Sequence, residues 1–127
     1  MITNYKELRV WIAAEELFEF ICEDIKKFPQ NKIAWIIADQ LIRSAGSIGA
    51  NVAEGFARKT KNDILHFFTI AYGSAIESEV WINRAVKQKL ISEEAGKDRI
   101  EKIESILKMI NKFKSSLNKT ENIRTRN

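Results

Sequence analysis

Polar side chains that could bind a ligand or pair with another helix recur along the segment from Gln40 to Thr60. If the segment is helical, one side of it carries a polar row beside an apolar stripe. The members of this polar row are Gln40, Arg43, Ser47, Asn51 and Glu54. Arg43, Asn51 and Glu54 could hydrogen-bond Ser74 and Glu77 of a neighbouring helix, because buried polar groups need partners. They could also line a groove for an anion or RNA. We favour the structural role or a subunit interface.

Residue types suited to catalysis or metal binding are scarce. His66 is the sole histidine and Cys22 the sole cysteine. A di-iron bundle needs Glu-x-x-His on two helices, and zinc sites need several Cys or His ligands. His66 has no recognisable nucleophile nearby, and Arg58 precedes it by too many positions for the Arg-x4–6-His spacing of helical ribonucleases. The sequence therefore predicts no catalytic residue, no metal and no cofactor.

Two groups of cationic side chains could bind nucleic acid. They are Arg58, Lys59 and Lys61 after the polar row, and Lys112, Lys114, Arg124 and Arg126 near the C-terminal end. Clustered cations neutralise phosphates and release counterions, which gives salt-sensitive and sequence-tolerant binding. The alternative is that these cations only keep a helical bundle soluble, since Glu101 and Glu104 interrupt the pattern and no aromatic stacking platform is visible. The predicted nucleic-acid-binding residues are Arg58, Lys59, Lys61 and Lys112.

Four long helices are predicted to position these residues. Apolar side chains recur every three to four positions over about residues 5–28, 32–56, 61–89 and 93–117. The seam of the first helix would be Trp11, Ala14, Phe18, Ile21, Ile25 and Phe28. Pro29 ends that helix, and Thr60 and Ser92 are suited to be N-caps of the third and fourth. Short connections favour an all-α, antiparallel up-down-up-down bundle over residues 1–117, with residues 118–127 as a disordered polar tail.

The second and third predicted helices carry apolar or small residues on two sides. Gly46 and Gly49 would weaken the second helix by about 2 kcal/mol together, which close packing must offset. On the third helix a second apolar row projects away from the seam and consists of Leu65, Tyr72, Ile76 and Val80. Apolar surface of this extent usually marks a partner interface, so we expect self-association through this row. The alternative is a thick intrachain core.

The composition indicates one ordinary soluble domain. The chain has 127 residues, of which 45% are hydrophobic and 30% charged, and no apolar run approaches the length of a membrane span. No signal pattern precedes the first helix, so a cytoplasmic location without membrane contact is expected. The net charge of +4 suits an anionic partner but does not require one.

Four motifs resemble the 23S rRNA-intervening sequence protein family: LRVW, FP, QLIRSAGSIGANVAEG and IAYGSAIESE, spread over about Leu8 to Leu117. In the second helix the matching positions are Gln40, Leu41, Arg43, Ser47, Ile48, Asn51, Ala53, Glu54 and Gly55. In the third helix they are Ala71, Gly73, Ser74 and Glu77. Val52 replaces an isoleucine, and Gly49 stands where many members have proline.

The resemblance implies a left-handed four-helix bundle that assembles into a pentamer. Some members are encoded in insertions of large-subunit rRNA genes, and a related pentameric, basic accessory protein of diversity-generating retroelements works with a reverse transcriptase and nucleic acid. Together with the residues, this predicts a non-enzymatic homo-oligomeric binding or scaffold protein with RNA as the leading ligand. The alternative is an adaptor or structural oligomer whose partner is another protein.

Overall fold

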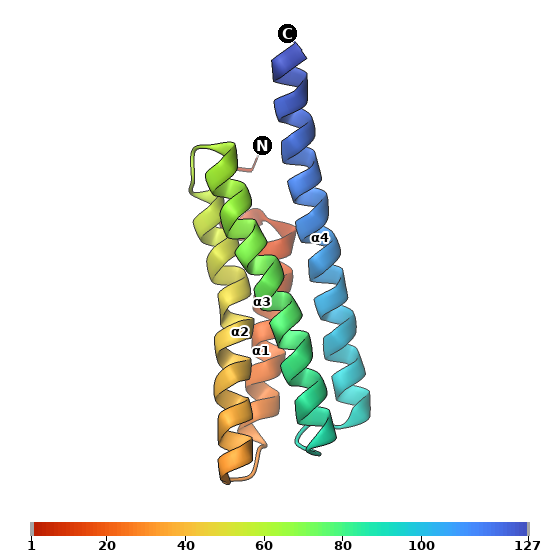
Figure 1. Cartoon of the computed structure of the whole chain (residues 1–127). Coiled ribbons are helices and arrows are strands. Elements are labelled where there is room, and N and C mark those ends of the chain that lie inside the picture. Colours follow the sequence, from red (N-terminus) through yellow and green to blue (C-terminus); the bar gives the residue numbers. More distant parts are fainter. Residues whose placement is uncertain (1, 127) are drawn as a thin grey trace.

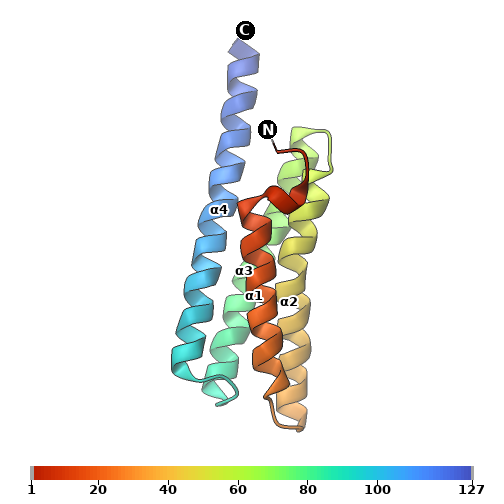
Figure 2. The same ribbon diagram turned by 180° about the vertical axis from the view of Figure 1, so that it is seen from behind.

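The chain folds into four long helices that lie side by side. The computed structural model describes the backbone of residues 2–126 and the side chains of residues 2–119. A short 3-10 helix, η1 (Tyr5–Glu7), precedes α1 (Arg9–Lys26), α2 (Lys32–Phe56), α3 (Lys61–Lys87) and α4 (Glu93–Arg126). Successive helices run in opposite directions, and α4 extends beyond the others at one end (Figures 1 and 2). The predicted all-α four-helix bundle is confirmed.

The helix boundaries follow local capping chemistry. Thr60 Oγ1 accepts a hydrogen bond from the Asp63 amide at 3.2 Å, and Ser92 Oγ accepts one from the Ala95 amide at 3.1 Å. Both N-caps were predicted, whereas Asn31, which caps α2 through a 2.9 Å bond from the Ala34 amide, was not. The predicted first helix is divided, because Leu8 is extended between η1 and α1.

Three further boundaries differ from those predicted, and the first is the end of α1, which is Lys26 rather than Phe28. At the end of α3, Lys89 adopts a left-handed conformation with φ of 61°, and its amide donates to the Val86 carbonyl at 2.9 Å. The helix therefore ends at Lys87 rather than Lys89. At the other terminus, α4 continues past Leu117 to Arg126. The side chains of residues 120–127 lie outside the described part, so the predicted polar tail over 118–127 stays a prediction.

The core is built from large aliphatic side chains of all four helices. Its fully buried members include Leu17, Ile21, Leu41, Ile48, Val52, Phe68, Ile82, Ile103, Ile106 and Ile110. Phe68 also stacks on Phe113 with ring centroids 4.2 Å apart, which joins α3 to α4. The predicted seam of α1 is rotated: Leu17 is buried, whereas Trp11 and Phe18 are half-buried and face α2. Burial of each aliphatic side chain contributes about 1.5–3 kcal/mol.

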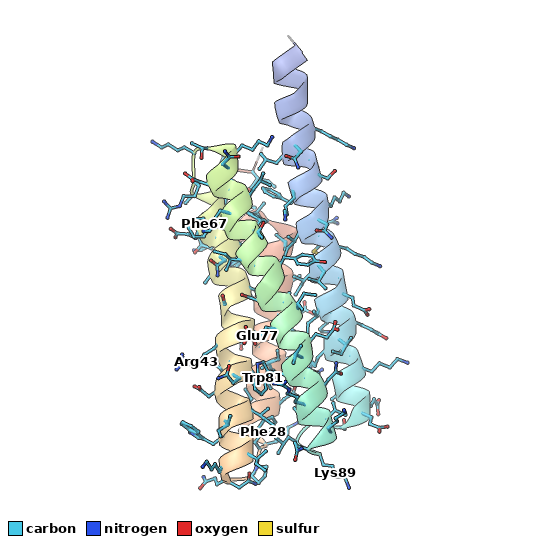
Figure 3. The ribbon with its side chains drawn as sticks, viewed as in Figure 1. Phe28, Arg43, Phe67, Glu77, Trp81 and Lys89 are labelled. Atoms are coloured by element: carbon cyan, nitrogen blue, oxygen red, sulfur yellow. The ribbon has the colours of Figure 1, made fainter. Side chains whose placement is uncertain are left out.

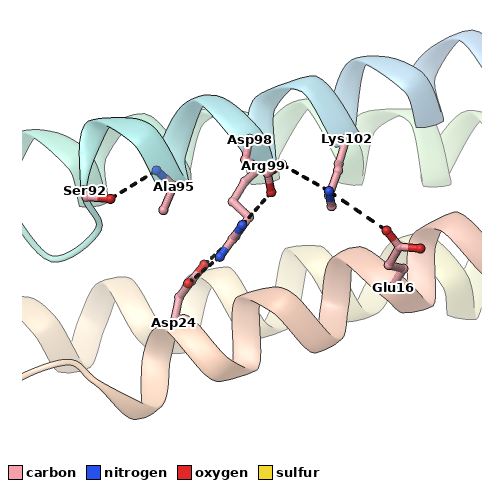
Figure 4. A network of polar contacts seen from close by, with 7 residues as sticks. All are labelled: Glu16, Asp24, Ser92, Ala95, Asp98, Arg99 and Lys102. Carbon is pink, nitrogen blue, oxygen red and sulfur yellow. Dashed lines mark hydrogen bonds and ion pairs between the residues drawn. The ribbon is translucent and has the colours of Figure 1, made fainter.

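A buried ion pair joins α1 to α4 (Figure 4). Arg99 donates from Nε to Asp24 Oδ2 at 2.8 Å and from Nη2 to Asp24 Oδ1 at 2.7 Å, so the pair is bidentate. The two side chains are only 11% and 9% exposed. Arg99 also donates to Asp98 at 2.6 Å and lies over the ring of Phe20. The hydrogen bond to Asp24 raises the pKa of Arg99, which favours the charged form of its guanidinium.

The charged residues around this ion pair are more exposed to solvent. Lys102 lies 3.2 Å from Asp98 and 4.0 Å from Glu16, linking the same two helices. Hydrogen bonds from Arg99 and then from Lys102 lower the pKa of Asp98. None of these contacts was predicted from the sequence, because an aspartate inside an apolar seam looks like an ordinary solvated residue until its partner is known.

Candidate nucleic-acid interface

The four residues predicted to bind nucleic acid lie on segments at the same end of the bundle. The α2–α3 turn, the start of α1 and the C-terminal half of α4 all lie at this end (Figures 1 and 2). Its cationic residues are Lys6, Arg9, Arg58, Lys59, Lys61, Lys112 and Lys114, and we call this region the basic end. The acidic residues beside it are Glu7, Glu54 and Asp63, so positive charge is in excess.

Individual contacts show how the basic end is held together. Arg9 and Lys112 line the same open cleft of about 310 Å³ between α1 and α4. Lys114 Nζ donates to Thr69 Oγ1 at 3.0 Å, which ties α4 to α3. The up-down topology thus brings two groups that are far apart in the sequence to the same end of the bundle, where α4 packs against α1 and α3.

The four residues predicted to bind nucleic acid differ in whether their charged groups already have a partner. Arg58 donates to Glu54 and its guanidinium lies 4.8 Å from the centre of the Phe67 ring, so it is already engaged. Among the described side chains, no ion pair involves Lys59, Lys61 or Lys112. Lys59 and Lys112 are exposed, and Lys61 is half-buried. The three lysines are therefore better placed than Arg58 to contact a phosphate.

Three members of the polar row, Arg43, Asn51 and Glu54, do not pair with α3 as expected. Arg43 projects away from the bundle and pairs with Asp39 of its own helix at 3.0 Å, while Glu77 accepts a 3.3 Å bond from Trp81 (Figure 3). Asn51 donates to the Ser47 carbonyl at 2.8 Å. The proposed bonds from Arg43, Asn51 and Glu54 to α3 are thus absent from the described residues.

Serines make the contact between α2 and α3 instead. The hydroxyls of Ser44 and Ser78 are hydrogen-bonded at 3.0 Å, and those of Ser47 and Ser74 at 2.9 Å. Small hydroxyls let the helices approach closely, whereas Arg43 and Glu77 are too long to fit and turn outward. Gln40 lies half-buried along the same face.

The glycines of the two motifs have different surroundings. A Cβ at Gly55 would lie 2.9 Å from the Phe68 ring and 3.0 Å from the Phe67 Cβ, so the end of α2 needs glycine to pack on α3. A Cβ at Gly73 would meet nothing within 4 Å. Gly55 therefore has an intrachain packing role, and Gly73 does not.

The predicted interface row on α3 is divided between core and surface. Leu65 and Tyr72 are half-buried, and Tyr72 packs against the core of its own chain. Ile76 and Val80 are exposed, as is Ile70. The structure also exposes Trp35 and Ile42 on α2, residues that the predicted interface did not include. Trp35 is 70% exposed and lines an open cleft of about 550 Å³ beside Phe28 and Pro29.

Catalytic groups do not gather anywhere in the described part of the chain. His66 is exposed and contacts Phe67 edge-on, with ring centroids 5.2 Å apart. Burial, followed by the nearby charge of Glu19, raises the pKa of Cys22, which makes this thiol a poor nucleophile. Among the described residues, no three His, Cys, Asp or Glu side chains lie close enough to hold a metal ion. None of the helices in this part is both long and apolar enough to cross a membrane.

Fold and surface together define an all-helical bundle protein with a basic end and exposed apolar flanks. Residues 6–112 match the sequence model of the 23S rRNA-intervening sequence proteins, so the chain belongs to that family. The fold is similar to that of a protein of unknown function from the S23 ribosomal protein family of Bacteroides thetaiotaomicron. The TM-score is 0.77 and the sequence identity 23%, over 83% of this chain and 97% of that one. No curated protein matches the chain.

Proposed function

We propose that the protein is a non-catalytic, homo-oligomeric scaffold that binds the phosphate backbone of structured RNA at its basic end. The observation that carries the proposal is that the segments with Lys59, Lys61 and Lys112 lie at the same end of the bundle, where acidic residues are fewer. Flexible, unpaired lysines suit phosphate contacts that carry no base sequence.

Oligomerisation would multiply this modest charge. A single basic end offers only a few phosphate contacts, and each contact changes the slope of log affinity against log salt by only about 0.7–0.9. Several copies linked in one assembly raise the effective concentration of every further contact. A pentamer, as the resemblance implies, would present five such ends. The family description refers to an intervening sequence of 23S rRNA, which makes structured RNA the first ligand to test.

The test measures affinity for a structured RNA hairpin across a salt series. Wild type is compared with Lys59→Gln/Lys61→Gln/Lys112→Gln, which removes three cations of the basic end. The matched control is Lys27→Gln/Lys32→Gln/Lys97→Gln, at the opposite end. We expect the first variant to lower the salt slope by about 2–3 and the control to leave it unchanged. Absence of wild-type binding at low salt, or equal losses in both variants, would refute RNA binding at the basic end.

A second candidate is an adaptor whose partner is another protein. The exposed indole of Trp35 favours it, because tryptophan is enriched at protein interfaces. This function predicts no RNA binding at low salt, so the same titration separates the two candidates.

A further inference from the structure

Two strips of mainly apolar residues lie on flanks of the bundle that face away from each other. We define the α2 flank as Trp35, Ile42 and Gly46, and the α3 flank as Ile76, Val80 and Lys87. On α2 the successive members of the strip are seven and then four residues apart, and on α3 they are four and then seven residues apart. Both spacings keep the three side chains on one side of an α-helix. The two strips therefore have matching spacing when the helices run antiparallel.

Contacts inside the chain fix the direction of the α2 flank. A Cβ at Gly46 would meet the ring of Phe18 at 3.3 Å, so the side of α2 that carries Gly46 faces α1. The opposite side of α2 carries Ser44 and Ser47, which bond to α3. The α2 flank thus lies on the α1 side of α2, away from α3. Trp35 and Ile42 are nevertheless exposed there, by 70% and 42%.

The α3 flank points the other way. Thr69 lies on the same ridge as Ile76 and Val80, and Lys114 of α4 bonds to it at 3.0 Å. The side of α3 that bonds to α2 carries Ser74 and Ser78 instead. The α3 flank therefore lies on the α4 side of α3, where Val80 is 41% exposed.

The two flanks match in height along the bundle. The bond between Ser44 and Ser78 marks one common height of the antiparallel helices. Because the two helices are antiparallel, a residue two positions before Ser44 is level with a residue two positions after Ser78. This places Ile42 at the same height as Val80. The same counting, two residues in the other direction, pairs Gly46 with Ile76. Trp35, nine residues before Ser44, is likewise level with Lys87, nine residues after Ser78.

Each of the three pairs is chemically complementary. Ile42 and Val80 would bury two exposed aliphatic side chains together. At Gly46 the ring of Phe18, which is half-buried, takes the place of a side chain, so Ile76 would pack on the edge of that ring. Lys87, which makes no ion pair among the described residues, would place its ammonium on the exposed indole of Trp35.

We propose that the α2 flank of one copy packs against the α3 flank of a second copy in the same orientation. This inference rests on the proposed homo-oligomeric function and names the surfaces that build it. The contact is head-to-tail, so an open assembly keeps one unused α2 flank at one end and one unused α3 flank at the other until a ring closes. Because every copy has the same orientation, all basic ends lie on one side of the assembly.

Two exposed positions give a complementation test. Ile42→Glu blocks the α2 flank and Val80→Glu blocks the α3 flank, each by placing a carboxylate in an apolar contact. Both side chains are solvent-exposed in the single chain, and circular dichroism checks that the helices are retained. The matched control is Ile12→Glu, which is 48% exposed and lies one turn before Glu16 on the α4 side of α1.

Mass is measured by light scattering over a concentration series. We expect wild type and the Ile12→Glu control to form the same oligomer, and each flank variant alone to be a monomer of 14.6 kDa. An equimolar mixture of the two flank variants should form a dimer of twice that mass, because it restores one intact α2–α3 contact. A mixture that stays monomeric, or a flank variant that assembles like wild type, overturns the proposed surfaces while oligomerisation itself stands. A monomeric wild type overturns both.

Discussion

Removal of the Arg99 guanidinium is expected to destabilise the fold strongly. Arg99→Met keeps most of the side-chain length but leaves the Asp24 carboxylate, 9% exposed, without its bidentate partner. Losing one member of a buried ion pair typically costs about 3–5 kcal/mol, because the remaining charge stays desolvated. The neighbouring Lys102 is not bonded to Asp24 in the structure and so does not replace the lost partner.

The double variant Asp24→Leu/Arg99→Met separates desolvation from packing. An apolar pair of similar volume is often neutral or more stable than a buried ion pair, by up to about 4 kcal/mol. We therefore expect the double variant to unfold within about 1 kcal/mol of wild type or at higher denaturant concentration. The two single substitutions should be non-additive, with a coupling energy of about 2 kcal/mol or more.

Urea unfolding followed by circular dichroism measures these differences at one protein concentration. The fixed concentration is needed because any oligomer contributes to apparent stability. Arg99→Met should lower the midpoint without changing the slope, since the unfolded surface is the same. Two results would refute the inference that this ion pair is desolvated in the folded protein. One is a loss of less than about 1 kcal/mol in the free energy of unfolding of Arg99→Met, and the other is additive losses in the double variant.

Three smaller perturbations test other parts of the structure. Gly55→Ala should lower stability by about 1–3 kcal/mol in urea unfolding, because the new methyl group would press on the Phe68 ring; unchanged stability would contradict the close packing of α2 on α3. Lys89→Gly should raise the melting temperature and increase the free energy of unfolding by up to about 1 kcal/mol, because glycine adopts the left-handed φ of 61° without strain. A destabilised Lys89→Gly variant would argue against the αL end of α3. Hydrogen bonds from Arg99 and Lys102 favour the charged form of Asp98 and lower its pKa below the ordinary 3.8. The stability that these bonds contribute is complete above pH 3.8 and is lost as the pH falls through the lowered pKa. Asp98→Asn should therefore flatten the loss of stability in acid, measured by urea midpoints from neutral pH downward, and an unchanged acid profile would contradict the assignment.

Local features of the chain were predictable because they depend on neighbours in sequence. Apolar side chains at three- and four-residue spacing indicated four helices, and hydroxyls at Thr60 and Ser92 marked two of their starts. The same reasoning misplaced the seam of α1, where Leu17 rather than Phe18 is fully buried. Both residues are apolar and adjacent, so periodicity alone could not tell which one faces the centre of the bundle.

The sequence by itself determined the class of fold, the approximate helices and the residue types available at the candidate site. Only the tertiary structure decided which of those residues meet. It paired Asp24 with Arg99 and Ser44 with Ser78, placed Lys112 beside Arg9 in a cleft between α1 and α4, and turned Arg43 outward. Such contacts depend on the height and rotation of one helix against another. These are set by the packing of the whole core, which no local pattern records.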